Sequence, residues 1–261
     1  MSKIRITAVS YLNTKPLLYG LLKSELADQI DLQLDIPSEC ARRLKDEEVD
    51  LGLVPVAIIP ELTNARIISD YCIGTVGTVK TVAIYGDCPL EEMTSIYLDY
   101  HSKTSVALTR LLLKDFWKLS PTLIPAPVDY EQAIGGKTGG LVIGDRTIGL
   151  EEKYAYAYDL GEAWMNHTGL PFVFAAWVAI KQLDPEFLAA FNQALQRGVA
   201  EIPQLMYLLP SPDPKFDLKE YFTHFISYEL DLPKRKALSI FLQSLGSQLS
   251  PTLEKSLVST A

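Results

Sequence analysis

The sequence predicts an α/β protein of two lobes, each a mixed β-sheet flanked by helices, with a ligand cleft between the lobes. Three observations predict this fold class. Strand and helix patterns alternate over residues 4–55, the alternation starts again near residue 90, and a long apolar strand follows at residues 172–180. The length of 261 residues suits two domains or one large domain.

The first series of elements is strand, helix, strand, helix, strand. Apolar and polar residues alternate over residues 4–9 and again over residues 32–36, which predicts two strands. A helix is expected over residues 13–20, and Ser38 is expected to cap a second helix. Residues 50–55 form a short apolar strand that ends in a proline. Apolar strands joined by helices predict a parallel sheet, which binds ligands at the carboxyl ends of its strands.

A second series follows a crossover. The β-branched residues at positions 75–86 predict one strand. Beyond it, strands are expected at residues 96–98, 123–124 and 141–143, and helices at residues 102–117 and 130–134. After the apolar strand the chain is helical, with one helix starting at Asp184-Pro185 and another stopping at Gly246.

The restart of the pattern predicts a discontinuous first lobe. Residues 1–87 and 171–261 would form this lobe, and residues 88–170 would form the second. Two crossovers between lobes create a cleft that can close on a small ligand. This arrangement is that of the periplasmic-type solute-binding proteins.

The composition narrows the function classes. Because 24 Lys and Arg stand against 32 Asp and Glu, a net charge of −8, we expect neither nucleic acid nor an anionic membrane as the main partner. The cysteines Cys40, Cys72 and Cys88 are too widely spaced for a disulfide framework or a metal cluster, so we expect no metal. The chain opens without a secretory signal and has no membrane-length apolar stretch, which predicts a cytoplasmic protein. Its oligomeric state is not predicted.

Two turns carry polar side chains suited to an anion. The first follows the strand at residues 4–9 and holds Ser10, Tyr11 and Asn13. The helix that begins there offers unpaired backbone amides and a partial positive charge, which suit a carboxylate. A residue that only caps the helix explains Ser10 or Asn13 equally well.

The second turn holds Ser102, Thr104 and Ser105 at the start of the helix expected at residues 102–117. Two such turns, one in each lobe and facing a common cleft, would suit a ligand with two acidic groups. Further polar residues near the crossover could line the cleft floor, although β-propensity alone also explains the threonines: Thr78, Lys80 and Thr81.

A set of motifs runs in order along residues 3–200. They are Val-Ser-Tyr-Leu-Asn-Thr-Lys-Pro-Leu at 9–17, Asp-Leu-Gly-Leu-Val-Pro at 50–55, Gly-Thr-Val-Lys-Thr-Val at 77–82, Ser-Lys-Thr-Ser at 102–105, Ile-Gly-Asp at 143–145, Asp-Leu-Gly-x-x-Trp at 159–164, and Thr-Gly-Leu-Pro-Phe-Val-Phe-Ala-x-Trp at 168–177. This set resembles the chorismate dehydratases, the first enzymes of the futalosine route to menaquinone.

The resemblance implies a fold like that of type II periplasmic binding proteins. It also implies dehydration of chorismate, a small dianion, to 3-[(1-carboxyvinyl)oxy]benzoate without a cofactor. By resemblance, Asn13 and the Thr81 hydroxyl lie nearest the reacting atoms, and Gly144 and Asp145 belong to the substrate site. The sequence departs from the family at Thr81, where serine is usual, and at Thr78, where proline is usual.

Dehydration of chorismate removes the ring C3 proton and the C4 hydroxyl and produces an aromatic ring. The motif positions hold no histidine, cysteine or paired carboxylates to act as an obvious base. We therefore expect the enolpyruvyl carboxylate of the substrate to take the proton, oriented by Asn13. Thr81 would bond the departing hydroxyl, and the hydroxyls of residues 102–105 would anchor the ring carboxylate. Asp145 is a candidate for assisting the hydroxyl or for capping the next helix.

Three other functions are open at this stage. A transporter's binding module would share the fold without the chemistry, but the missing secretory signal counts against it. A dihydroxynaphthoate synthase of the same pathway is a second alternative, and the Ser-Tyr-Leu-Asn opening favours the dehydratase over it. A ligand sensor is the third, and the chain shows no helix-turn-helix or basic face as its output.

Overall fold

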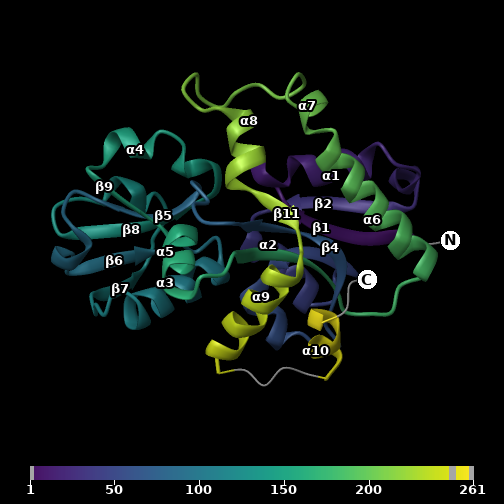
Figure 1. Cartoon of the computed structure of the whole chain (residues 1–261), viewed down its shortest axis with the longest axis horizontal. Helices are drawn as coiled ribbons and strands as arrows, with labels where there is room; N and C mark the ends of the chain where they lie inside the picture. Colours follow the sequence, from purple (N-terminus) through teal and green to yellow (C-terminus); the bar gives the residue numbers. More distant parts are fainter. Residues whose placement is uncertain (1–2, 247–250, 259–261) are drawn as a thin grey trace.

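Two mixed β-sheets, one in each half of the molecule, form the framework of the protein (Figure 1). The computed structural model describes residues 3–246 and 251–258. Within these residues, six strands form the first sheet in the order β11-β4-β10-β3-β1-β2, and five form the second in the order β7-β6-β8-β5-β9. The predicted mixed α/β fold class is confirmed.

The first sheet has a parallel and an antiparallel part. Its strands are β1 (Ile4–Val9), β2 (Ile30–Asp35), β3 (Leu51–Pro55), β4 (Arg66–Thr75), β10 (Phe172–Ala179) and β11 (Ser227–Glu229). As the strand-helix-strand pattern predicts, β1 pairs in parallel with β2 and β3, whereas β10 runs antiparallel between β3 and β4. Because β10 lies in the middle of the sheet, all of its residues are buried.

Several helices belong to the same half of the molecule as the first sheet, and most of them pack on it or on one another. They are α1 (Lys15–Leu22), α2 (Pro37–Lys45), α6 (Pro185–Ala200), α7 (Ile202–Leu205), α8 (Leu218–Glu220), α9 (Leu232–Ser244) and α10 (Pro251–Val258). In Figure 1, α1 and α6 lie above the sheet and α9 and α10 lie below it. The backbones of α1 and α6 come so close that a Cβ atom on Gly198 would lie 2.1 Å from the Pro16 carbonyl oxygen. Glycine is therefore required at this crossing.

The second sheet is smaller. Its strands are β5 (Val82–Gly86), β6 (Ser95–Leu98), β7 (Thr122–Pro125), β8 (Thr138–Ile143) and β9 (Tyr156–Asp159), and its helices are α3 (Lys103–Asp115), α4 (Leu150–Lys153) and α5 (Leu160–Thr168). The pairs β6–β7 and β6–β8 are parallel, whereas β5 runs antiparallel to β8 and β9. The apolar face of α3 is buried, which confirms the helix predicted there.

The crossover between the sheets corrects one prediction. Residues 75–86 do not form one strand, because β4 ends at Thr75 in the first sheet and β5 begins at Val82 in the second. The backbone between them turns through positive φ at Gly77 (φ 90°) and Lys80 (φ 69°), which no continuous strand allows. The chain thus enters the second sheet before residue 87, where we expected the first segment to end.

The start of α2 corrects another prediction. Ser38 does not cap this helix: Pro37 is its first residue, and Ile36 holds the cap position without a side-chain hydrogen bond. Proline is favoured at the first helical position, because its missing N–H has no partner there. By contrast, Asp184 caps α6 as predicted, and its carboxylate accepts from the amides of Glu186 and Phe187.

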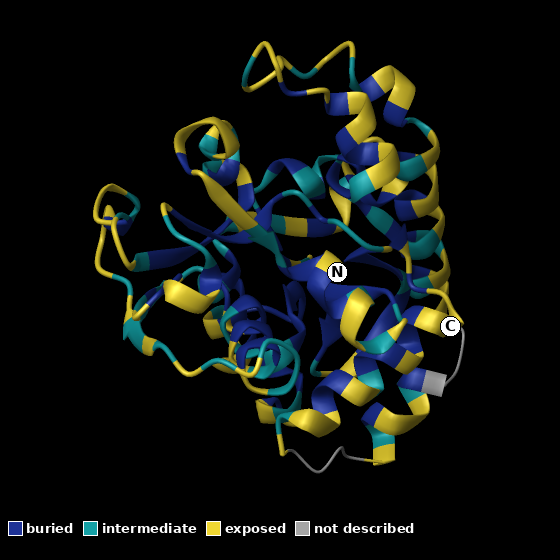
Figure 2. Cartoon of the chain, turned by 60° about the vertical axis from the view of Figure 1, so that its left-hand side comes forward, coloured by how far each residue is buried: buried dark blue, intermediate teal, exposed yellow. Residues whose placement is uncertain are grey.

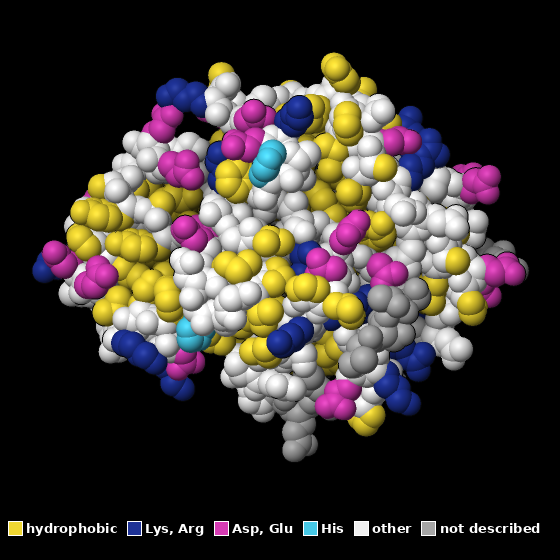
Figure 3. Space-filling model, in the orientation of Figure 1, with side chains coloured by type: hydrophobic (Ala, Val, Ile, Leu, Met, Phe, Trp, Pro, Cys, Tyr) yellow, Lys and Arg dark blue, Asp and Glu magenta, His cyan; other side chains and the backbone are white. Residues whose placement is uncertain are grey.

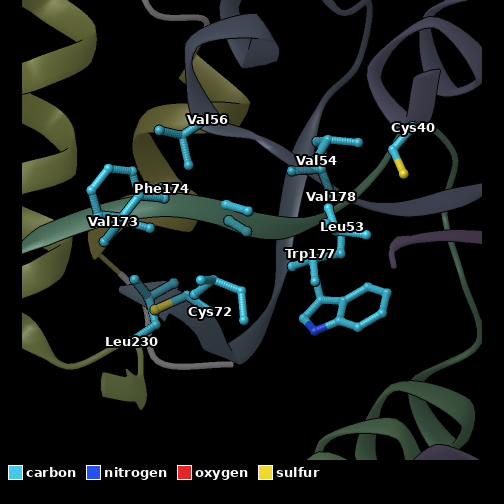
Figure 4. Close-up of a cluster of buried hydrophobic side chains, with 14 of the residues drawn as sticks. Cys40, Leu53, Val54, Val56, Cys72, Val173, Phe174, Trp177, Val178 and Leu230 are labelled. Atoms are coloured by element: carbon cyan, nitrogen blue, oxygen red, sulfur yellow. The ribbon is translucent and has the colours of Figure 1, made fainter. Parts of the chain in front are cut away.

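The core lies between the strands and the inner faces of the helices. In Figure 2 the strands are mostly buried, while exposed residues follow the outer faces of the helices and the loops. Figure 4 shows Leu53 of β3 and Trp177 of β10 gathered with Cys40 and Cys72 in one apolar cluster. Burial raises the pKa of both of these thiols to about 12, so they are protonated at neutral pH.

Charged side chains lie among apolar ones over the face shown in Figure 3, with acidic and basic groups intermingled. Among the helices that the structure describes, none is long and apolar enough to cross a membrane. Nor, in the described part of the chain, do three or more His, Cys, Asp or Glu residues group as metal ligands would.

Candidate active site

A cavity of about 480 Å³, partly open to solvent, lies where strands of both sheets end. The first sheet contributes Val9 at the end of β1, Pro55 at the end of β3, and Phe174 of β10. The second contributes Ile143 at the end of β8 and Val82 at the start of β5. Both lobes therefore form its walls.

The lining of this cavity carries no charge. Among the described residues that form it, none is Asp, Glu, His, Lys or Arg. Its polar side chains are those of Tyr11, Asn13, Thr81, Ser102 and Ser105. The cavity can thus bind an anion only through neutral donors and backbone dipoles.

Two helices begin at the cavity wall, one from each lobe. Pro37, the first residue of α2, and Ser102, the cap of α3, both line the cavity. The first amides of a helix have no carbonyl one turn earlier, and they carry about half a positive charge in sum. Two such helix ends place partial positive charge at a cavity whose lining has no charged side chain.

Asn13 and Thr81 approach the cavity from opposite lobes. Asn13 lies in the 3₁₀ turn Leu12–Thr14 after β1, and Thr81 immediately precedes β5. Oγ1 of Thr81, a fully buried residue, lies 2.9 Å from the hydroxyl oxygen of Tyr221. The hydroxyl of Tyr228 donates to the backbone carbonyl of Asn13 at 2.9 Å. The C-terminal part of the chain thus supports both residues.

The start of α3 divides the three predicted hydroxyls into two groups. Ser102 and Ser105 line the cavity, and the Ser102 side chain accepts from the amide of Ser105 at 3.4 Å. Thr104 is outside the lining: its Oγ1 accepts from the amide of Ala57 in the first lobe at 3.1 Å. This hydroxyl therefore joins the lobes.

The turn after β1 is fastened to the second lobe at two points. The Tyr11 hydroxyl bonds Nδ1 of His101, and burial, with the nearby Arg146 guanidinium, lowers the pKa of this histidine. Both carboxylate oxygens of Asp145 accept from the amide of Leu12, at 3.0 and 3.1 Å. Although Asp145 is an exposed residue, partial desolvation of its carboxyl raises its pKa.

Gly144 allows the turn after β1 to pack closely against the second lobe. Its φ of 67° lies in the left-handed region, and a Cβ atom there would lie 2.6 Å from the ring of Tyr11. Only glycine allows the tyrosine ring to pack against this backbone. Asp145 itself is outside the cavity lining and binds the start of the 3₁₀ turn in the other lobe, rather than the start of the next helix as considered from the sequence.

A buried carboxylate shapes the crossover. Asp159, which caps α5, accepts from the amides of Val79 (3.1 Å) and Lys80 (2.7 Å), and burial raises its pKa. Val79 and Thr81 line the cavity, but Thr78 and Lys80 do not. The Lys80 ammonium instead lies 5.0 Å from the centre of the Phe225 ring, in the C-terminal part of the chain.

The structure brings the two predicted turns to one cavity, as expected. Of the predicted site residues, those that line it are Tyr11, Asn13, Thr81, Ser102, Ser105 and Gly144, and those outside its lining are Ser10, Thr78, Lys80, Thr104 and Asp145. The backbone amide of Ser10 donates to the Asp35 carbonyl at 2.9 Å.

Sequence analysis missed the supporting side chains of His101, Asp159, Tyr221 and Tyr228. Asp159 lies inside a motif of the family resemblance, at 159–164, and His101 directly precedes another, at 102–105; these positions were the available signals for them. The tyrosines lie in an aromatic stretch that reads as packing, and Tyr221 is 140 residues from its partner Thr81. No local sequence pattern predicts a hydrogen bond between residues so far apart in the chain.

A family model described as menaquinone biosynthesis matches residues 4–246. The chain belongs to this family. A chorismate dehydratase of Thermus thermophilus is a relative of this family member, 28% identical over 245 residues, which cover 83% of this chain and 87% of the relative.

Solved structures agree on the fold of this menaquinone-biosynthesis family member. A protein of Archaeoglobus fulgidus matches with a TM-score of 0.69 at 15% identity, over 94% of this chain and 98% of that one. A Candida albicans protein, described as having the generic periplasmic binding protein fold, matches with a TM-score of 0.60 at 10% identity, over 98% and 95% of the two chains. The predicted periplasmic-binding-protein-like architecture is confirmed.

Proposed function

We propose that this protein is a chorismate dehydratase, a hydro-lyase of menaquinone biosynthesis that forms 3-[(1-carboxyvinyl)oxy]benzoate. The main support for this proposal is that Asn13 and Thr81, from opposite lobes, line one cavity without charged side chains, in a chain of this family. The named relative of Thermus thermophilus supports the same activity.

The cavity suits a substrate with two carboxylates. We place the ring carboxylate at the start of α3, where Ser102, Ser105 and the first helical amides can donate. The enolpyruvyl group then lies toward Asn13 and the C4 hydroxyl toward Thr81. Because no charged side chain competes in the lining, these neutral donors set the orientation of the dianion.

The uncharged lining favours a base supplied by the substrate. The enolpyruvyl carboxylate takes the C3 proton, the C3–H electron pair becomes the second bond between C3 and C4, and the C4–O bond breaks. The departing hydroxide takes up the same proton and leaves as water, so the step is redox-neutral and balanced. Asn13 orients the carboxylate, and Thr81 donates to the departing oxygen, where negative charge develops.

We also assign the protein to the cytoplasm, where chorismate-consuming biosynthesis would take place. Its three cysteines are free thiols, and Cys40 and Cys72 are buried without a disulfide partner. Unpaired thiols fit a reducing compartment.

Incubation with chorismate tests the proposal directly. The expected product is aromatic and lighter than chorismate by one water, so absorbance and mass spectrometry both detect it. Asn13→Ala should lower kcat by about 100–1,000-fold, the range seen when a donor to developing charge is removed. The full-length protein with Thr81→Ser, which keeps the hydroxyl, is the matched control and should retain most activity.

Two outcomes would contradict the proposal. Chorismate that binds tightly and stays unchanged would identify a solute-binding protein, the class that the fold alone also allows. An Asn13→Ala variant with wild-type turnover would remove Asn13 from the reaction.

A further inference from the structure

Tyr221 stands directly behind Thr81 and outside the cavity lining. It opens the π-helical segment η7 (Tyr221–Phe225), and its side chain is 1% exposed. Its hydroxyl oxygen lies 2.9 Å from Thr81 Oγ1, which is itself 1% exposed. Two buried hydroxyls at this distance share a hydrogen bond, because leaving either one unpaired would be costly.

The wide π-helical turn of η7 sets the position of the Tyr221 side chain relative to Thr81. The amide of Ile226 donates to the carbonyl of Tyr221, five residues earlier, at 3.1 Å. Such π-helical turns are rare and often mark functional sites. The turn follows directly on α8, so the extra residue sets which side chain points toward Thr81.

The direction of the shared hydrogen bond follows from counting protons. Each hydroxyl has one proton to donate. If Thr81 donates to the substrate's C4 oxygen, Thr81 Oγ1 can receive from Tyr221 but cannot donate to it. Burial raises the pKa of Tyr221, against the opposing effect of the neighbouring Thr81 and Asn13 side chains, so the phenol keeps its proton.

We propose that Tyr221 is a positioning residue for the dehydration: its phenol donates to Thr81 Oγ1 and thereby turns the Thr81 proton toward the departing C4 hydroxyl. This inference rests on the proposed function. Tyr221 neither gains nor loses a proton in the step, since the water takes its proton from the substrate. The methyl group of Thr81 further restricts the orientation of its hydroxyl, because a β-branched side chain has few rotamers.

The test uses Tyr221→Phe, which removes only the hydroxyl. We expect kcat for chorismate to fall by about 10–100-fold, less than for the loss of a direct donor, because Thr81 keeps its hydroxyl and loses only the orientation of its proton; KM should change little. Tyr154→Phe is the matched control: Tyr154 is also a buried tyrosine, and its hydroxyl donates to the Glu131 carbonyl in the second lobe at 2.6 Å. The control variant should turn over chorismate like the wild type, and thermal unfolding of both variants measures what the lost hydroxyl does to stability alone.

A double-mutant cycle separates positioning from mere packing. If Tyr221 acts through Thr81, adding Tyr221→Phe to Thr81→Val should lower kcat no further than Thr81→Val does. Additive losses in the double variant, or a Tyr221→Phe variant with wild-type kcat, would overturn the inference while leaving the dehydratase assignment intact. A wild-type protein that leaves chorismate unchanged would overturn both.

Discussion

Replacing Thr104 by valine should destabilise the protein and leave substrate binding nearly unchanged. Thr104 is fully buried, and its Oγ1 accepts from the amide of Ala57 at 3.1 Å. Ala57 is the second residue of the 3₁₀ segment Val56–Glu61, so its amide has no carbonyl partner within the segment. Valine has a similar shape but no acceptor. A buried amide left unpaired costs about 1–3 kcal/mol, and about 2 kcal/mol lowers the thermal midpoint of a chain of this size by about 4–8 °C.

Thermal unfolding followed by circular dichroism measures this loss, and steady-state kinetics with chorismate measures binding. Thr104→Ser keeps the acceptor and is the matched control, with an expected midpoint close to that of the wild type. The sequence assigned this hydroxyl to the ring carboxylate instead. If Thr104→Val kept the wild-type midpoint and raised KM by about tenfold or more, the hydroxyl would bind substrate and the reasoning from the structure would be refuted.

Two further predictions concern pH and packing. Because the pKa of His101 is lowered in the folded protein, the unfolded chain takes up its proton first, so stability should be full above the unfolded value of about 6.5 and decline as the pH falls below it. Urea unfolding from pH 5 to 8 should show a flatter profile for His101→Gln, and identical profiles would contradict the assignment. Gly198→Ala should lower the free energy of unfolding by about 1–3 kcal/mol, because the added Cβ would lie 2.1 Å from the Pro16 carbonyl oxygen. Helix propensity alone predicts the opposite sign, so a stabilised Gly198→Ala, or an equal loss in the exposed control Gln196→Ala, would argue against the close crossing.

Most helices and strands could be predicted because their signals are local. Alternation marked β1, and the Asp-Pro pair marked the start of α6. The strand predicted over residues 75–86 was wrong because its β-branched composition is the same on both sides of the crossover. What interrupts it is a turn that Asp159 holds from 79 and 80 residues away, through the amides of Lys80 and Val79. Such a tertiary hydrogen bond leaves no mark in the local pattern.

The candidate site was likewise predictable from the sequence only in part. Its two turns could be located from the sequence, because polar residues at the junction of a strand and a helix are a local feature. Which hydroxyls face the cavity could not be predicted, since Thr104 and Ser105 are adjacent in sequence and one turns to the other lobe while the other lines the cavity.

The amino-acid sequence alone determined the α/β class, the family resemblance and the positions of the two turns, because each rests on patterns that are complete within short segments of the chain. Only the tertiary structure decided that Asp145 holds the opposite lobe, that Tyr221 stands behind Thr81, and that the cavity lining is uncharged. These contacts join residues more than a hundred positions apart. Each polar group could pair with many others, and the packing of the two lobes determines which of them lies within hydrogen-bond distance.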